Sequence, residues 1–127
     1  MRKIVGYFDG TNPLLLTALV CNGHDTLPVS NGRDNHGQHV RLINNQNRFE
    51  LLLGHVHKIF APENHQPSDA TYQDVFHVCG TYSIPLLLEV PAAMQPEARS
   101  LLGDPPEIVR LVDPADMLAA ATAILAD

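Results

Sequence analysis

Phe49-Glu50-Leu51-Leu52-Leu53-Gly54-His55-Val56 is the stretch that decides the fold. Three leucines run without interruption from Leu51 to Leu53, and the same pattern recurs from Leu86 to Leu88. A strand with one solvated face alternates apolar and polar side chains, whereas a continuous apolar run is typical of a parallel strand buried on both faces. The two runs therefore predict a parallel sheet with helices packed on either side.

Segments of strand and helix character alternate through the rest of the chain. The expected strands are 3–8, 26–30, 49–56, 84–91 and 108–112, and the expected helices are 14–21, 71–79, 97–102 and 117–125. Tyr72, Val75, Phe76 and Cys79 lie at helical spacing, and Gly80 is expected to end that helix. This order predicts one α/β domain over residues 1–127, a three-layer sandwich with a mostly parallel five-stranded sheet, flavodoxin-like or Rossmann-like.

The first helix has recognisable ends. Thr11 or Asn12 is expected to cap it, with Pro13 near its first position, and Asn22-Gly23 is a stop signal. The helix is short and apolar nearly all round, which predicts that it is buried. Pro28 has no N–H for a sheet hydrogen bond, so it is expected at an edge position or a break in the second strand.

Residues 35–43 allow two interpretations. A helix capped by Asp34 is favoured, although Gly37 weakens it. In the alternative, residues 39–43 form a strand that continues as a hairpin through Asn44-Asn45-Gln46-Asn47 into the strand that begins at Phe49.

A dense polar stretch, Pro28-Val29-Ser30-Asn31-Gly32-Arg33-Asp34-Asn35-His36-Gly37-Gln38-His39, lies between apolar segments. A segment with so few apolar side chains is expected to be a loop, where binding residues concentrate. In open parallel sheets, ligands bind beyond the carboxyl ends of the strands, so this loop, the residues after Phe8 and His55 are expected to share one cleft. Glu89 and Asp113 follow the fourth and fifth strands and are expected at the same edge.

These polar strand tips predict a site for a polar or anionic small molecule that bears a phosphate or a carboxylate. Free amides of the first helix favour an anion, an arginine such as Arg33 can fork onto it, and histidines such as His36 and His55 suit acid–base chemistry. The predicted catalytic residues are His36 and His55. The predicted ligand-binding residues are Asp9, Gly10, Thr11, Asn12, Ser30, Asn31, Gly32, Arg33, Asp34 and Asn35.

Charge is unevenly distributed along the chain, whose formal net charge is −6. Residues 1–60 hold six basic and four acidic side chains, and residues 61–127 hold two basic and ten acidic ones. The net negative charge argues against a nucleic-acid partner. An anion site therefore belongs to the first half, and the acidic second half is expected to be a solvated face.

The sequence shows no signature of a CxxC motif, a membrane segment or a compact zinc site. Cys21 and Cys79 form no CxxC unit and lie in apolar surroundings, so they are expected to be buried free thiols. No signal peptide or membrane-length apolar run is present, so a cytoplasmic location and no membrane partner are expected. His55-x-His57 and His36-x-x-His39 match no compact zinc pattern, and we predict no metal site.

Two functions remain open at this point. The first is a small-molecule binding domain, with an enzymatic role left undecided and the cofactor unknown, because the glycine motifs GxGxxG and GxxxxGK are missing. The second is a non-catalytic oligomeric subunit with a structural or regulatory role, in which the helix over 14–20 or the terminal helix packs on a partner. A homodimer is compatible with both.

Overall fold

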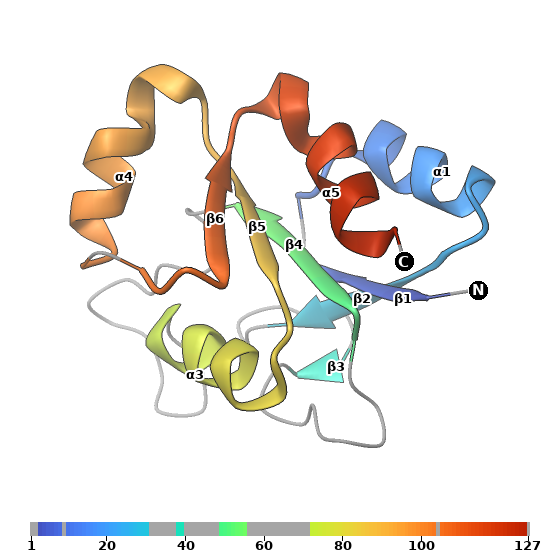
Figure 1. The fold of residues 1–127 in the computed structure, drawn as a ribbon, viewed down its shortest axis with the longest axis horizontal. Coiled ribbons are helices and arrows are strands. Elements are labelled where there is room, and N and C mark those ends of the chain that lie inside the picture. Colours follow the sequence, from blue (N-terminus) through green and yellow to red (C-terminus); the bar gives the residue numbers. More distant parts are fainter. Residues whose placement is uncertain are drawn as a thin grey trace.

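The computed structural model describes residues 3–8, 10–30, 38–39, 49–55, 72–103 and 105–126 (Figure 1). Its strands are β1 (Ile4–Tyr7), β2 (Asp25–Ser30), β3 (Gln38–His39), β4 (Leu51–His55), β5 (Leu86–Glu89) and β6 (Val109–Val112). Its helices are α1 (Pro13–Cys21), α3 (Tyr72–Tyr82), α4 (Gln95–Leu101) and α5 (Met117–Leu125), with single 3-10 turns at Ala92–Met94 and Pro114–Asp116 leading into the last two.

The strands form one sheet in the order β3-β2-β1-β4-β5-β6, and every pairing is parallel. The predicted α/β fold is confirmed, and the five predicted strands are all present. Those five alone follow the flavodoxin-like order, whereas the two-residue strand β3 at one edge completes the Rossmann-like order. In either description the chain changes direction across the sheet between β1 and β4, which is where a ligand crevice is expected.

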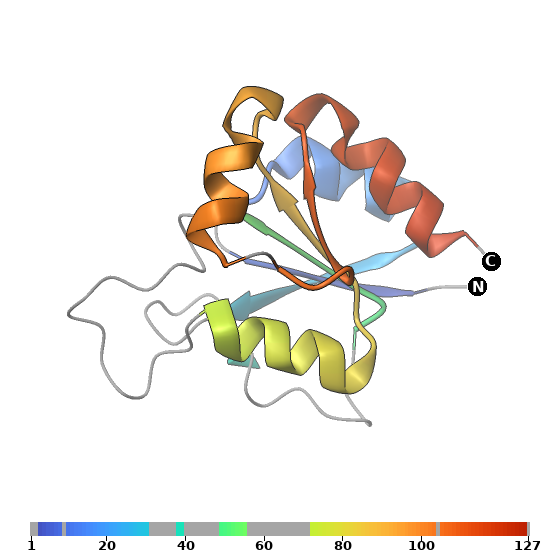
Figure 2. The same cartoon turned by 60° about the vertical axis from the view of Figure 1, so that its left-hand side comes forward.

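Helices cover both faces of the sheet (Figures 1 and 2). One hydrophobic cluster joins α1 and α5 to the sheet, and the other joins α3 and α4 to it. The physical reason is crossover handedness: right-handed connections that step in opposite directions from the centre place their helices on opposite faces. Within β4, Leu51 and Leu53 belong to the first cluster and Leu52 to the second, so this strand is buried on both sides, as its leucine run predicts.

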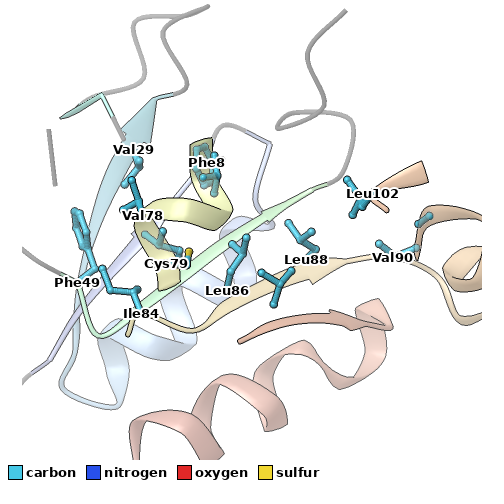
Figure 3. Packing of buried hydrophobic residues seen from close by; sticks show 14 residues of the cluster. Phe8, Val29, Phe49, Val78, Cys79, Ile84, Leu86, Leu88, Val90 and Leu102 are labelled. Carbon is cyan, nitrogen blue, oxygen red and sulfur yellow. The ribbon is translucent and has the colours of Figure 1, made fainter. Parts of the chain in front are cut away.

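The cluster beneath α3 is drawn in Figure 3. Leu86 and Leu88 of β5 lie there with Cys79 of α3 and Ile84, each fully buried. Leu87, between the two leucines, belongs to the opposite cluster. Alternate residues of one apolar run thus fill two different cores.

Residues 38–39 contradict the helix predicted over 35–43, and they agree with the alternative only in placing His39 in a strand. Gln38 and His39 form a strand whose register partners are Val29 and Ser30 of β2, so they are not helical. The pairing is parallel and β4 pairs with β1 and β5, so the hairpin alternative is also wrong. Backbone pairing with β2 overrides the weak local helix signal. The other residues of 35–43 lie outside the described part of the chain.

Helix α3 ends later than predicted. It continues through Gly80 to Tyr82, because one glycine in a helix costs only about 1 kcal/mol relative to alanine. The chain then turns at Ser83, whose φ is 54°, and the amide of Ile84 donates to the carbonyl of Cys79 over 2.9 Å. This is the closing bond of a Schellman motif, with serine in the position that glycine usually occupies.

Helix α1 lies at the surface, which corrects the prediction that it is buried. Leu15 and Leu19 are its buried residues, one turn apart, while Leu14 is 78% exposed and Val20 is 49% exposed. A helix laid on a sheet has only one stripe in contact, whatever the polarity of its other side chains. Cys21 at its end is exposed as well, so the prediction of two buried thiols holds only for Cys79.

Pro28 lies within β2, opposite Tyr7 of β1. On the other side of β2, pairing with β3 begins only at Val29. Pro28 therefore lies just before the residues that pair with β3, a position that suits a residue without an N–H donor. Among the helices that the structure describes, none combines the length and apolarity of a bilayer span.

Candidate functional site

Four strand ends converge at the carboxyl edge of the sheet. Gly10, Thr11 and Asn12 lie between β1 and α1, His55 ends β4 and Glu89 ends β5. Asp113 follows β6 directly. Because the strands are parallel, these tips lie at the same edge of the sheet, as predicted.

His55 connects three strands at the point where the sheet changes direction. Its Nε2 lies 2.8 Å from the carbonyl oxygen of Gly10, and its Nδ1 lies 3.4 Å from Oε2 of Glu89. The two side chains are 15% and 18% exposed, so their contact is largely shielded from water. Both ring nitrogens therefore face oxygen acceptors, and the ring binds the β1 loop to the end of β5.

In the loop between β1 and α1, the side chains of Thr11 and Asn12 bond to nearby backbone groups. The hydroxyl of Thr11 donates to the carbonyl of Phe8 over 2.7 Å, and Oδ1 of Asn12 accepts from the amide of Leu14 over 2.9 Å. Asn12 is thus the cap of α1, one of the two caps predicted. Gly10 has a φ of 91°, a conformation that side chains disfavour, and it turns its carbonyl toward His55.

The amides at the start of α1, which the sequence predicts to favour an anion, already make hydrogen bonds within the protein. The amide of Leu14 is bound to the Asn12 side chain, and the amides of Leu15 and Leu16 donate to the Asn12 carbonyl. Pro13 has no amide proton to offer. An anion at this helix end would have to displace one of these bonds.

Asp113 is held in place by two backbone amides. Its Oδ1 accepts from the amide of Ala92 and its Oδ2 from the amide of Ala115, over 2.9 and 3.0 Å. The second bond caps the 3-10 turn that leads into α5, and the first ties the end of β6 to the segment after β5. Both carboxylate oxygens are therefore engaged in holding the fold.

A hollow of about 180 Å³ opens between the first turns of α1 and α5. Asn12 and Glu89 contribute its polar side chains, and the other lining residues have apolar side chains. Sequence reasoning missed this apolar lining, although its position in the turns that follow β1 and β6 is where the crevice rule points. The lining residues are Asn12, Leu14, Leu15, Glu89, Pro114, Ala115, Met117 and Leu118.

The structure brings together only part of the predicted site. Gly10 and His55 share a hydrogen bond, and Glu89, which contacts His55, lines the same hollow as Asn12. Thr11 donates to the carbonyl of Phe8 within the loop. Ser30 ends β2. The predicted residues that lie outside the described part of the chain are Asp9, Asn31, Gly32, Arg33, Asp34, Asn35 and His36.

Two other chemistries have limited support. Within residues 3–8, 10–30, 38–39, 49–55, 72–103 and 105–126, no three histidine, cysteine or acidic side chains are grouped to hold a metal ion. Burial raises the pKa of the Cys79 thiol to about 12, so it stays protonated at neutral pH and is a poor nucleophile.

The two thiols are expected to react differently with a chromogenic disulfide reagent. The native protein should release one equivalent of chromophore, from exposed Cys21, and the second only in denaturant, because Cys79 is buried and protonated. The Cys21→Ser variant should lose the native-state reaction. Rapid release of two equivalents from folded protein would contradict the packing of α3.

No protein-family model matches the chain, and no curated protein sequence matches it. The function of the chain is therefore inferred from the geometry at the carboxyl edge of its sheet.

Proposed function

We propose that this protein binds a small polar metabolite at the carboxyl edge of its sheet, at the change of direction between β1 and β4. The observation that carries the proposal is His55, which joins the loop after β1 to the end of β5 at that point. Glu89, the carboxylate partner of His55, lines a hollow at this edge, and a concave surface with a few polar groups is typical of a small-molecule site.

In this proposal, the polar loop after β2 recognises the phosphate or carboxylate of the ligand. Arg33 is the side chain best suited to fork onto such an anion, and its position comes from the sequence alone. A catalytic role for His55 would require a ligand atom to take the place of the Gly10 carbonyl at Nε2. Binding without a reaction is therefore the function that the described geometry supports best.

A thermal-shift screen with nucleotides, sugar phosphates and flavins tests this proposal. A compound that binds the folded state should raise Tm by roughly 10 °C when its concentration is about 100 times its Kd. Arg33→Ala should weaken an anionic ligand by about tenfold or more, since hydrogen bonds between charged groups contribute about 1.5–3 kcal/mol.

Arg110→Ala is the matched control, because Arg110 is an exposed arginine in β6, away from the strand tips. It should leave every ligand-induced shift unchanged. If no compound moves Tm, the proposal fails for these classes of metabolite. If Arg33→Ala and Arg110→Ala behave alike, the role assigned to Arg33 is wrong.

An oligomeric structural or regulatory subunit is the second candidate. It is favoured by the exposed apolar side chains of α1 and α5, which share one face of the sheet: Leu14 and Val20 in α1 and Leu118 in α5. Measuring the assembly state by light scattering tests this candidate but not the ligand-binding one. A monomer would leave this function without a partner copy, whereas ligand binding is compatible with any assembly state.

A further inference from the structure

We infer that the hollow between α1 and α5 binds the protonated amino group of a small organic amine, with Glu89 as its counter-ion. This inference rests on the proposed function, because the hollow opens at the same edge of the sheet, and it adds the chemical class of one part of the ligand. Three observations carry it: the state of the Glu89 carboxylate, the apolar lining and the charges around the opening.

The carboxylate of Glu89 is the charged group of the hollow. Its side chain is only 18% exposed, and Oε2 lies 3.4 Å from the His55 ring, longer than a strong hydrogen bond. Among the residues that the structure describes, His55 is the one group that pairs with it. The carboxylate oxygens have lone pairs that the His55 ring does not use, and these can accept hydrogen bonds from the N–H groups of a ligand.

The remaining lining fits an apolar body of limited size. Leu15 and Met117 are buried, while Leu14 and Leu118 are exposed at the opening. About 180 Å³ is less than the roughly 300–1,000 Å³ typical of sites for drug-sized molecules. A short branched chain or a single ring fills such a space and removes the leucine surfaces from water.

The surrounding charges favour a cation over an anion. Asp113 and Asp116 flank Pro114 and Ala115 of the lining, and the amides that begin α1 and the turn before α5 are already capped. Lys3, Arg99 and Arg110 are the described lysine and arginine side chains, and none of them lines the hollow. An organic anion would therefore meet like charge at Glu89, and among the described lining residues only the side-chain amide of Asn12 offers it a polar donor.

Three ligands of one shape test the inference on the full chain: isobutylamine, isobutanol and isobutyrate. Their binding is measured by titration of backbone amide NMR shifts. Isobutylamine should bind at least tenfold more tightly than the other two, shift amides in the first turns of α1 and α5, and weaken as salt is added.

Two variants locate the binding in the hollow. Glu89→Gln should weaken isobutylamine at least tenfold, and its fold is checked by circular dichroism because the variant also alters the contact with His55. Ala115→Leu leaves the carboxylate intact but fills the hollow, and should abolish binding. Ala119→Leu is the control, since Ala119 is exposed on α5 and does not line the hollow.

Equal binding of isobutylamine and isobutyrate, no binding of isobutylamine, or full affinity in Ala115→Leu would each overturn the inference. These results do not test the proposed function, which the thermal-shift screen tests separately. Metabolites that shift Tm without any amine preference would remove only the subsite. An amine bound in the hollow with no response to the metabolites would keep the subsite and remove the anion-binding proposal.

Discussion

Replacing Gly6 with alanine should lower the free energy of unfolding by about 2 kcal/mol, within the roughly 1–3 kcal/mol typical of an overpacked core. A Cβ at this position of β1 would lie 2.6 Å from Cδ2 of Leu52 and 2.8 Å from Cγ2 of Val29. Both neighbours are fully buried and sit on the strands either side of β1, so neither can move into solvent. Gly6→Val should cost more than Gly6→Ala for the same reason.

Gly80→Ala is the matched control for this substitution. Gly80 lies in α3, and a Cβ there meets no atom within 4 Å. Alanine should therefore raise stability by up to about 1 kcal/mol through its higher helix propensity. Chemical denaturation of both variants measures the change in the free energy of unfolding, which should be negative for Gly6→Ala and positive for Gly80→Ala. A Gly6→Ala protein as stable as the parent would show that β2, β1 and β4 are not packed as described.

Leu53→Ala should lower the free energy of unfolding by about 3 kcal/mol, within the roughly 2–5 kcal/mol range for truncation of buried leucines. Leu53 lies in the middle of the sheet and is fully buried beneath α1 and α5. The surrounding strands are paired on both sides, so the backbone has little freedom to close the cavity. The midpoint of urea unfolding should fall with little change in slope.

Leu101→Ala provides the comparison for Leu53→Ala. Leu101 is 51% exposed in α4, and its truncation should change stability by no more than about 0.5 kcal/mol. Similar losses at the two positions would mean that the central leucine run is not the core. They would also remove the basis for reading the continuous runs as strands buried on both faces.

Local patterns predict the elements well because each depends on neighbours in the chain. Met117–Leu125 is a helix with the bounds expected, and Asn12 caps α1 ahead of Pro13. The central strands follow from the leucine runs. Errors arise where pairing between separate segments competes with a weak local signal, as when Gln38 and His39 pair with β2 instead of forming a helix.

The candidate site is less visible in the sequence. His55 was identifiable as a polar strand tip, and so was Glu89, but nothing local shows that they contact one another. Nor does a pattern show that Gly10 and His55, 45 residues apart, share a hydrogen bond. The hollow depends on the relative placement of α1 and α5, which come from opposite ends of the chain.

By itself, the sequence determined the alternation of strands and helices, the parallel sheet and the edge where polar groups gather, because burial on two faces and helix capping leave periodic, local traces. Only the tertiary structure decided the strand order, the pairing of β3 with β2, the outward position of Cys21 and the meeting of Gly10, His55 and Glu89. The physical reason is that these features depend on crossover direction and on packing between distant segments.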